Sequence, residues 1–571
     1  MVIVQDGPRW LHFARLGEVV TAVAPAEVAP ALAKVEAAVS EQGLHAAGYM
    51  AYEAAAAYDL SVHPPLADAS PLLWFGLYAA AETVSLPAPS ASCQLSEWRP
   101  SLSVTDFRHA VGRIKAYIAA GHTYQVNLTF PLQSEFHGDP WTLFQQLVAQ
   151  QAGCAAYLDT GRFVICSVSP ELFVRRAGEM LLSRPMKGTS QRGRTLAEDR
   201  TRMAWLQQSE KDRAENLMIV DMIRNDMGRI AEVGTVRVPH LFAAERYPTL
   251  LQMTSTVTAR TRRSWSEIMA AMFPCASVTG APKIRTMQII RELEPEARGV
   301  YTGAIGFLSP SGEGQFNVAI RTLVLDRQTG QARYGVGSGI VWDSQADAEY
   351  EECLLKAAVV RRPRASFKLL ESLLWEPESG YFLLEEHLAR LADSAEYFGV
   401  PADLKEIRSA LVAAASDLTE PVKVRLLVDL DGAAAVQVEP LGADRLAEPV
   451  RVKLAAEPVD SADPFLYHKT TCRQTYERAL AGRGDCDDVL LWNERGEVTE
   501  TGNSNVVLAL GGELSTPHQF SGLLAGTFRG WLLAHGRIRE RVITLADLRR
   551  AEGVYLINSV RRWRRAVICD P

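Results

Sequence analysis

The sequence lacks the features that mark membrane, secreted and disulfide-stabilised proteins. No apolar run of about 18 residues occurs in it, and residues 1–6 contain neither the basic nor the apolar region of a signal peptide. The eight cysteines are scattered and form no Cys-x-x-Cys pair, which argues against a disulfide framework and against a zinc site. We therefore expect a cytoplasmic protein without a membrane partner.

Long basic stretches are missing as well. The net charge is −7, and the one basic cluster, residues 561–565, is explained more simply as the solvated end of a strand. A mildly acidic chain of this kind is not expected to bind nucleic acid.

The length of 571 residues is too great for a single hydrophobic core, so two or three domains are expected. The clearest boundary is Val360–Ala365, a charged segment that contains proline and follows a helical pattern. It predicts domains at residues 1–362 and 363–571. Strand-like runs such as 163–166 and 318–324 alternate with helix-like stretches, which favours α/β or α+β folds for both parts.

Two acidic pairs stand out in the first part. Asp212 and Glu215 are three residues apart on a predicted helix, and Glu349 and Glu352 repeat this spacing. If the two pairs converge, their repulsion calls for a divalent cation, and oxygen ligands without His or Cys favour Mg²⁺. The alternative for each pair is a solvated helix face.

Several segments of the first part are suited to binding an anion. Arg321 lies in a predicted strand, Tyr334–Gly339 follows a strand, and Ala276–Lys283 begins a predicted helix. Lys187, in the turn-rich segment 184–189, is a nucleophile, a carboxylate clamp or an ordinary surface charge. Each signal is weak alone, because a glycine-rich stretch is usually a turn and a strand arginine is usually an ion pair. Beside a magnesium site, they suggest a small organic acid with several charges.

The order of these motifs resembles the chorismate-utilising enzymes, and among them the aminodeoxychorismate synthases (component I). The resemblance covers residues 1 to about 360. The motifs occur in this order: Tyr124–Leu128, Ser169–Glu171, Pro185–Thr189, Lys211–Gly228, Ala276–Ile290, Arg298–Gly303, and the segments around Arg321, Gly335 and Glu352.

Two positions distinguish between members of this family. Relatives that add water carry a lysine where this chain has Gln125, and an amide cannot act as a base. Relatives that form anthranilate have alanine where this chain has Lys187. One departure is Gln252, which stands where many relatives have a histidine. The resemblance therefore implies addition of ammonia at C4 of chorismate, with Lys187 as a covalent nucleophile.

The resemblance also implies a role for each matching residue. Glu171 would protonate the departing hydroxyl, which requires a raised carboxyl pKa. Mg²⁺ would be held directly by Glu215 and Glu352, with Asp212 and Glu349 acting through water. The residues expected at the substrate are Arg321, Tyr301, Gly335, Thr279, Gly280 and Lys356. The chain has no Gly-x-Cys-x-Gly turn, so ammonia would come from a separate glutamine amidotransferase subunit or from solution.

The second part contains three features that a pyridoxal phosphate site needs. Lys469 ends an extended apolar run, Glu500 stands at the entry of a hairpin-like turn, and Gly522–Arg529 forms a loop that opens onto a helix N-terminus. A lysine, a carboxylate and an anion cradle match the aldehyde, the pyridine nitrogen and the phosphate of the cofactor. The alternatives are a surface lysine, a turn carboxylate and a helix cap.

Residues 365–571 resemble the fold-type IV pyridoxal phosphate enzymes, and most closely the aminodeoxychorismate lyases. By this resemblance Lys469 would bind the cofactor covalently, Glu500 would bond its ring nitrogen, and Arg390, Gly526 and Thr527 would bind its phosphate. A homodimer through this domain is also implied. The segment 369–372 resembles a tryptophan-binding motif of anthranilate synthases, but it lies beyond the domain boundary, and we interpret it as a coincidence.

Together the two resemblances predict a layered α/β sandwich followed by a smaller fold-type IV domain. The expected function is synthesis of 4-aminobenzoate in two steps, with pyruvate released in the second. One alternative joins an anthranilate synthase component to an aminotransferase. Another makes the second part an inactive scaffold that recruits the glutaminase.

Overall fold

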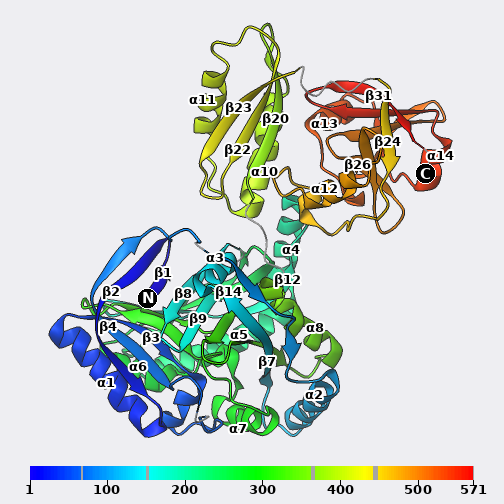
Figure 1. The fold of residues 1–571 in the computed structure, drawn as a ribbon. Coiled ribbons are helices and arrows are strands. Elements are labelled where there is room, and N and C mark those ends of the chain that lie inside the picture. Colours follow the sequence, from blue (N-terminus) through cyan, green and yellow to red (C-terminus); the bar gives the residue numbers. More distant parts are fainter. Residues whose placement is uncertain (66–67, 90, 150–152, 362–366, 442–447, 570–571) are drawn as a thin grey trace. The chain divides into compact units, whose positions relative to one another are not determined.

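The computed structural model consists of two compact units and describes the chain except residues 66–67, 90, 150–152, 362–366, 442–447 and 570–571 (Figure 1). The first unit comprises Met1–Gln191 and Met203–Arg364, and the second comprises Arg192–Arg202 and Ala365–Pro571. Most of the boundary segment expected from the sequence lies outside the described residues. The sequence did not predict that residues 192–202 belong to the second unit.

The first unit is built on one hydrogen-bonded system of 19 strands. These strands are β1 (Val2–Asp6), β2 (Arg9–Ala22), β3 (His45–Met50), β4 (Leu73–Val84), β5 (Cys93–Leu95), β6 (Arg99–Pro100), β7 (Gln125–Gly138), β8 (Cys154–Asp159), β9 (Phe163–Ser169), β10 (Leu172–Ala177), β11 (Met180–Arg184), β12 (Met186–Gln191), β13 (Arg237–Arg246), β14 (Leu250–Arg260), β15 (Gly280–Ala281), β16 (Ala304–Leu308), β17 (Gly314–Val318), β18 (Thr322–Asp326) and β19 (Gln331–Ile340).

Helices accompany this sheet system. They are α1 (Pro25–Gln42), α2 (Val104–Ala119), α3 (Pro140–Val148), α4 (Leu196–Gln208), α5 (Glu210–Gly228), α6 (Trp265–Met272), α7 (Lys283–Leu293), α8 (Ala346–Lys356) and α9 (Ala358–Arg361), with 3₁₀ turns η1 (Tyr52–Tyr58) and η2 (Ala276–Val278). The chain enters the first unit within α4, after Arg202.

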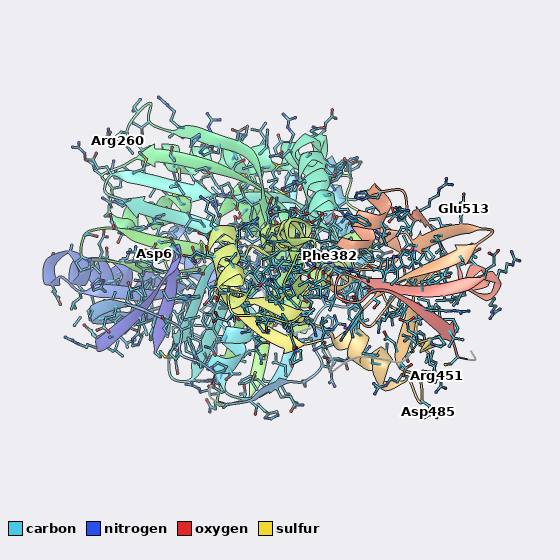
Figure 2. The ribbon with its side chains drawn as sticks, turned by 90° about the horizontal axis from the view of Figure 1, so that it is seen from above. Asp6, Arg260, Phe382, Arg451, Asp485 and Glu513 are labelled. Atoms are coloured by element: carbon cyan, nitrogen blue, oxygen red, sulfur yellow. The ribbon has the colours of Figure 1, made fainter. Side chains whose placement is uncertain are left out.

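Among the described residues, the three largest hydrophobic cores of the first unit lie between its layers. One core contains residues of α1, α5 and α6, and a second contains residues of α2, α3, α7 and α8. The third consists almost entirely of strand residues, among them Phe13, Tyr49 and Ile165. Sheet residues packed on sheet residues, with helices on the other faces, form the layered sandwich that the resemblance predicted. Arg260 lies at the end of β14, where its side chain is exposed (Figure 2).

Helices α5 and α8 confirm the spacing argument for the acidic pairs. Ser209 caps the N-terminus of α5, where its Oγ accepts a hydrogen bond from the Asp212 N–H. The buried face of α5 includes Ile219 and Ile223, and the acidic residues lie in its first two turns. The last turn of α8 contains Lys356, which suits the negative end of the helix dipole.

The structure corrects the predictions for the three segments that were expected to bind an anion. Arg321 is not in a strand, because β17 ends at Val318 and β18 begins at Thr322, and its φ of 50° is left-handed. The segment 334–339 does not follow a strand but forms most of β19, which pairs with β7. Lys283 does not face an anion site, since its Nζ lies 2.6 Å from Asp226 Oδ2.

The second unit contains two sheets. The first, with order β21-β20-β22-β23, is formed by β20 (Leu369–Glu376), β21 (Gly380–Tyr381), β22 (Val422–Val428) and β23 (Ala434–Pro440), and it is accompanied by α10 (Leu384–Phe398) and α11 (Leu404–Ala414). Side chains of both helices and of β20 and β22 form one core.

The other sheet has eight strands in the order β26-β25-β24-β31-β30-β27-β28-β29, and β26 also pairs with β27. Its strands are β24 (Val450–Leu454), β25 (Asp488–Trp492), β26 (Val498–Thr501), β27 (Asn505–Leu510), β28 (Glu513–Pro517), β29 (Arg539–Arg541), β30 (Gly553–Asn558) and β31 (Arg562–Ile568). The helical segments are α12 (Gln474–Ala481), α13 (Thr527–Ala534), α14 (Leu545–Arg550), η3 (Pro464–Leu466) and η4 (Gln519–Ser521). Among the described residues, no helix combines the length and apolarity needed to cross a membrane.

A buried arginine orders the segment that leads to Tyr301 in the first unit. Arg298 is 2% exposed and pairs with Glu294, which is 3% exposed, at 2.7 Å. Its guanidinium also donates to the carbonyl oxygens of Val278 and Asn127, both at 2.8 Å. The guanidinium makes these contacts away from water, so its N–H groups need acceptors from the protein. The loss of one acceptor would leave a buried charge only partly paired.

Replacing Arg298 by alanine is expected to lower the free energy of unfolding by about 3–5 kcal/mol, because Glu294 would remain buried without its counter-charge. Urea titration followed by fluorescence measures this change. Arg333→Ala is the control, since Arg333 is 39% exposed where it pairs with Glu296 and should contribute about 1 kcal/mol or less. Equal effects of the two substitutions would contradict the expectation.

Candidate active sites

A cavity of about 490 Å³ in the first unit collects most of the residues that the sequence singled out. All of the predicted residues of this part except Thr279 and Gly280 line it: Glu171, Lys187, Asp212, Glu215, Tyr301, Arg321, Gly335, Glu349, Glu352 and Lys356. Gly280, on β15, instead pairs with Val126 of β7, and the Thr279 hydroxyl donates to the carbonyl of Cys275. These two residues support the wall of the cavity from behind.

Lys187 lies on β12, where the pairing with β14 is interrupted between Met186 and Thr189. The sequence predicted a turn, and the structure has a strand with a bulge at this point. Gln252 of β14 fixes the bulge, because its Nε2 donates to the Gly188 carbonyl at 2.8 Å. The glutamine that departs from the family pattern therefore supports the lysine segment.

The pKa of Lys187 is lowered, first because the amine is buried and also because Lys356 is near. Glu215 and Glu171 oppose this effect. A lysine with a lowered pKa has a larger share of the uncharged amine, which is the nucleophilic form.

Glu171 lies in the same cavity and is 2% exposed. Burial raises the pKa of its carboxyl to about 7, although Ser277 and the charge of Lys187 act in the other direction. Among the described residues, its Oε1 has no hydrogen-bond partner. The raised pKa that the sequence argument required is confirmed, and Glu171 is suited to give a proton near neutral pH.

The Gln125 side chain approaches the same glycine of β19 as Lys187 does. A Cβ atom added to Gly339 would lie 2.6 Å from Gln125 Nε2 and 2.8 Å from Lys187 Nζ, so both groups reach the same point of β19. Neither polar atom of the Gln125 side chain has a partner within the described residues. Buried amides are rarely unpaired, so this group beside the Lys187 amine is unusual.

The four acidic residues approach the cavity from α5 and α8. Burial raises the pKa of Glu215, and the charges of Asp212 and Glu349 add to that, whereas Lys187 and Lys211 lower it. Glu352 pairs with Lys356 at 2.6 Å. The carboxylates are thus close enough to repel one another.

The described residues include no group of three or more His, Cys, Asp or Glu side chains arranged to hold a metal. Mg²⁺ commonly uses one or two carboxylates and keeps several waters. The all-oxygen donor set and its excess of negative charge therefore fit this ion without a closed protein cage.

Cationic groups line the wall formed by α8, β19 and Arg321. The left-handed backbone at Arg321 turns its guanidinium to donate to the carbonyl of Lys356. The Lys356 ammonium donates to the Gly337 carbonyl at 2.9 Å. Gly335 of the same strand gives room to Tyr301, since a Cβ atom there would lie 2.1 Å from Tyr301 Cγ. This wall can bind a carboxylate.

In the second unit, Lys469 follows the 3₁₀ turn η3 and not an extended run as predicted. Its carbonyl accepts a hydrogen bond from the Leu370 N–H of β20 at 3.0 Å. Burial lowers the pKa of Lys469 to about 8, helped by Arg390 and Arg473 and opposed by Glu371 and Glu500. An uncharged amine of this kind is suited to attack an aldehyde.

Glu500 lies on β26 and is buried among three donors. It accepts hydrogen bonds from the Tyr476 hydroxyl at 2.7 Å, the Leu524 N–H at 3.0 Å and Asn505 Nδ2 at 3.1 Å. Burial raises the pKa of its carboxyl to about 7. The sequence did not single out Tyr476, which is 24 residues away along the chain and carried no spacing signal.

The loop that precedes α13 confirms the predicted helix N-terminus, with Gly526 as the residue before the first turn. Arg390 Nη1 donates to the Ala525 carbonyl at 3.2 Å, and Thr527 Oγ1 lies 3.2 Å from His387 Nε2. These contacts bring Arg390, Gly526 and Thr527 together, as a phosphate cradle requires.

Two buried residues behind this cradle were not predicted as site residues. Glu371 Oε2 lies 2.6 Å from Arg390 Nη2 and 2.7 Å from His387 Nδ1. Although burial alone would raise it, the pKa of Glu371 is held at about 2 by Arg390 and His387. Glu371 is the acidic residue of segment 369–372, so that segment serves the second unit. The three-residue spacing of His387 and Arg390 on α10 was the signal that could have found His387.

Comparison with known proteins gives matches for both units. A family model described as chorismate binding enzyme matches residues 14–362, and one described as amino-transferase class IV matches residues 368–569. An aminodeoxychorismate synthase of Streptomyces griseus is 48% identical over 250 residues, which are 43% of this chain and 34% of that protein. Aminodeoxychorismate synthase component 1 of Klebsiella aerogenes is 40% identical over 274 residues, which are 48% of this chain and 60% of that protein.

The aligned part thus spans less than two thirds of either relative. Among solved structures, anthranilate synthase component I from Streptococcus pneumoniae has a TM-score of 0.53 at 24% identity and covers 63% of this chain and 92% of that one. This likeness shows the fold alone. The class IV model indicates pyridoxal phosphate as the cofactor of the second unit.

Replacing Gly335 by alanine is expected to displace Tyr301 and to lower the melting temperature by several degrees, because the new Cβ would overlap the tyrosine ring. Gly112→Ala is the control. Gly112 lies inside α2 with no heavy atom within 4 Å of the added Cβ, so this change should be neutral or slightly stabilising. Differential scanning calorimetry compares the two, and an unshifted transition for Gly335→Ala would contradict the contact.

Proposed function

Because the chain belongs to the family of chorismate binding enzymes, we propose that its first unit replaces the C4 hydroxyl of chorismate by an amino group. We propose further that its second unit splits the resulting 4-amino-4-deoxychorismate into 4-aminobenzoate and pyruvate. One observation carries the first proposal. A lysine with a lowered pKa and a buried carboxyl with a pKa of about 7 line the same cavity.

In the first reaction, the Lys187 amine forms a bond to C2 of the ring while Glu171 gives its proton to the C4 oxygen. The hydroxyl then leaves as water. Ammonia adds at C4, and the bond between C2 and Lys187 breaks as the ring double bonds return to their places. Arg321 and Lys356 supply positive charge for a carboxylate of the substrate. Gln125 cannot take a proton from water, which favours ammonia as the nucleophile.

Mg²⁺ is proposed as the metal of this cavity. Glu215 and Glu352 would hold it directly, with Asp212 and Glu349 acting through water. The ion would neutralise the ring carboxylate of the substrate and relieve the repulsion from Asp212 and Glu349 that adds to the effect of burial on the pKa of Glu215.

In the second reaction, Lys469 removes the proton from C4, and enolpyruvate leaves as the ring becomes aromatic. Pyridoxal phosphate supplies an electron sink when it is bound. Glu500 is available to its ring nitrogen, and Arg390, Gly526 and Thr527 to its phosphate. Two adjacent residues support this arrangement, because Leu524 donates to Glu500 and Ala525 accepts from Arg390.

A cytoplasmic location, a homodimer through the second unit and ammonia from a separate glutamine amidotransferase subunit remain predictions. The main alternative is an anthranilate synthase component joined to an aminotransferase. Lys187 disfavours it, since relatives that form anthranilate carry alanine at this position. The identity of the aminobenzoate, para or ortho, distinguishes the two.

The two lysines are expected to block different steps. With chorismate, ammonium, Mg²⁺ and pyridoxal phosphate, Lys187→Ala should abolish every product, because the covalent nucleophile is lost. Lys469→Ala should accumulate 4-amino-4-deoxychorismate and release no pyruvate. Glu171→Gln should lower the rate of the first step by about 10²–10⁴-fold, the usual contribution of a general acid. Liquid chromatography of the products measures all three.

Lys34→Ala serves as the control for these variants, since Lys34 is exposed on α1 and pairs only with the exposed Glu18. It should leave both steps unchanged. Undiminished formation of 4-amino-4-deoxychorismate by Lys187→Ala would remove this lysine from the mechanism.

The first step is expected to have a bell-shaped pH dependence. Glu171 must keep its proton, so the rate should fall as the pH rises through about 7. Lys187 must be uncharged, so the rate should also fall as the pH is lowered. Because the pKa of Lys187 is lowered, this fall should occur at a lower pH than it would for an ordinary lysine. Initial rates at a constant concentration of free ammonia test this. A rate that rises steadily above pH 8 would speak against Glu171 as the acid.

A further inference from the structure

The chain between Lys187 and Asp212 contains a segment, Arg192–Arg202, that is part of the second unit. The segment has a fixed shape of its own. Arg192 and Asp199 are 9% and 0% exposed and lie 2.6 Å apart, and the Gly193 N–H donates to Asp199 Oδ1 at 2.7 Å. A Cβ atom at Gly193 would lie 2.5 Å from Glu198 Cβ, so this position accepts only glycine. The result is a compact turn that opens α4.

This turn is bound to the end of α10. The Arg192 guanidinium lies 4.1 Å from the centre of the Tyr397 ring, and its Nη2 donates to the Tyr397 carbonyl at 2.7 Å. The Tyr397 hydroxyl in turn donates to the Gly193 carbonyl at 2.7 Å. Three contacts between the same partners, made away from water, hold the turn in one place.

The residue before Lys469 makes the next contact. The His468 ring stacks on Tyr397 at 4.2 Å, and its Nε2 lies 3.2 Å from the Arg194 carbonyl. Because a carbonyl only accepts, Nε2 carries the proton, and Nδ1 accepts from the Ser394 hydroxyl at 3.0 Å. Burial lowers the pKa of His468 to about 4, so this neutral form persists at neutral pH. The backbone at position 468 is therefore fixed by the turn.

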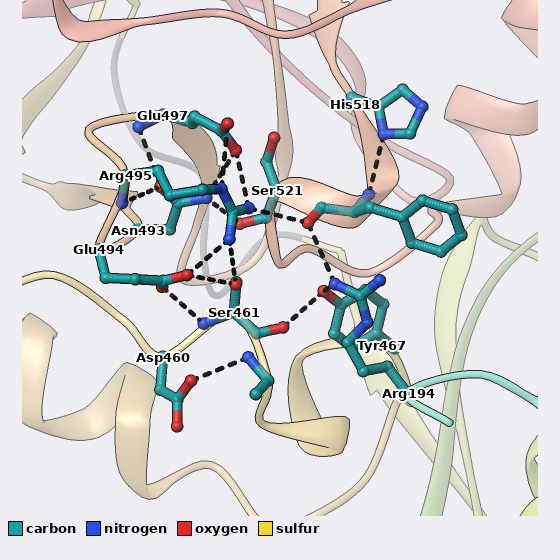
Figure 3. A network of polar contacts seen from close by, with 12 residues as sticks. Arg194, Asp460, Ser461, Tyr467, Asn493, Glu494, Arg495, Glu497, His518 and Ser521 are labelled. Atoms are coloured by element: carbon teal, nitrogen blue, oxygen red, sulfur yellow. Dashed lines mark hydrogen bonds and ion pairs between the residues drawn. The ribbon is translucent and has the colours of Figure 1, made fainter. Parts of the chain in front are cut away.

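Arg194 contacts two further segments of the second unit, as the polar network in Figure 3 shows. Its Nη1 donates to the Tyr467 hydroxyl at 3.2 Å and to the Phe520 carbonyl at 3.4 Å, and Glu198 holds its other nitrogens at 2.6 and 3.1 Å. Tyr467 lies two residues before Lys469. Phe520 lies just before the loop that leads to Gly526 and Thr527.

We infer that Arg192–Arg202 is a positioning segment of the second active site, which holds Lys469 in place through Tyr397, Tyr467 and His468. None of the residues assigned above to substrate or cofactor belongs to this segment. It fixes the backbone that carries Lys469. Along the chain, the segment lies between Lys187 and α5, which both belong to the first site. The second site therefore depends on residues from within the sequence of the first. This inference rests on the proposal that Lys469 binds pyridoxal phosphate.

The test uses the full chain saturated with pyridoxal phosphate. Arg194→Ala and His468→Ala should each move the pH midpoint of the cofactor absorption band at about 420 nm upward, because a displaced Lys469 is less buried. They should also lower the rate of pyruvate release on the order of 10²-fold, the cost of a misplaced reactive group. His468→Gln retains a donor for the Arg194 carbonyl and should restore most of both properties.

Arg200→Ala is the matched control on the same segment, since Arg200 is 60% exposed and pairs with the exposed Glu396. It should bind the cofactor with an unchanged band. Tyr467→Phe removes only the hydroxyl that Arg194 contacts, and it provides a milder variant if the alanine substitutions prevent folding. A raised pH midpoint of the absorption band in Tyr467→Phe then supports the inference.

The outcomes separate the two proposals. Variants that melt at a lower temperature but keep the band, its pH midpoint and the rate would give the segment a purely structural role and overturn the inference. A wild-type chain that takes up cofactor, with all variants equal to it, also overturns the inference but leaves the proposed lyase activity standing. A wild-type chain that takes up no pyridoxal phosphate removes both.

Discussion

The first unit depends on a single buried cation. Arg298 can be accommodated only if its donors find acceptors, and these come from η2, β7 and Glu294 at the end of α7. The Glu53 side chain of η1 completes the arrangement by accepting from the backbone N–H groups of 298 and 299. Since a partly satisfied guanidinium in this place is very costly, these elements assemble together or not at all. Tyr301, and with it the wall of the cavity, follows from that assembly.

Both candidate sites solve the same electrostatic problem in the same way. Each holds a lysine whose pKa is lowered by burial and by neighbouring cations, Lys356 in one unit and Arg390 and Arg473 in the other. Each also holds a carboxyl group whose pKa burial raises to about 7. A poorly hydrated environment disfavours every charged form, so near neutral pH it increases both the share of uncharged, nucleophilic amine and the share of protonated carboxyl. The two scaffolds share no topology, and the similarity lies in the physics of burial.

The sequence predicted those parts of the structure that depend on local spacing. The acidic pairs of α5 and α8, and the helix that begins after Gly526, follow from residues three or four apart and from capping preferences. Prediction from the sequence failed where the local conformation depends on pairing with strands that are distant along the chain. Nothing near Arg321 signals its left-handed backbone, and the glycines of β19 look like a loop until β7 pairs with them. Tyr476 and Glu371 were missed because their partners are separated from them along the chain, by 24 residues and by 16 to 19 residues.

Because residues 192–202 belong to the second unit, the two units are not separated by a single boundary in the sequence. The backbone crosses between the units at three places, after residues 191, 202 and 364, and a single break in the connecting segment leaves two of these crossings intact. The N-terminal fragment would still carry Arg192, Gly193 and Arg194, whose contacts with Tyr397, Tyr467, His468 and Phe520 reach the other fragment. The two pieces would then meet as a peptide ligand and its receptor. A cut in the connecting segment would therefore leave the second unit complete only while residues 192–202 stay bound to it.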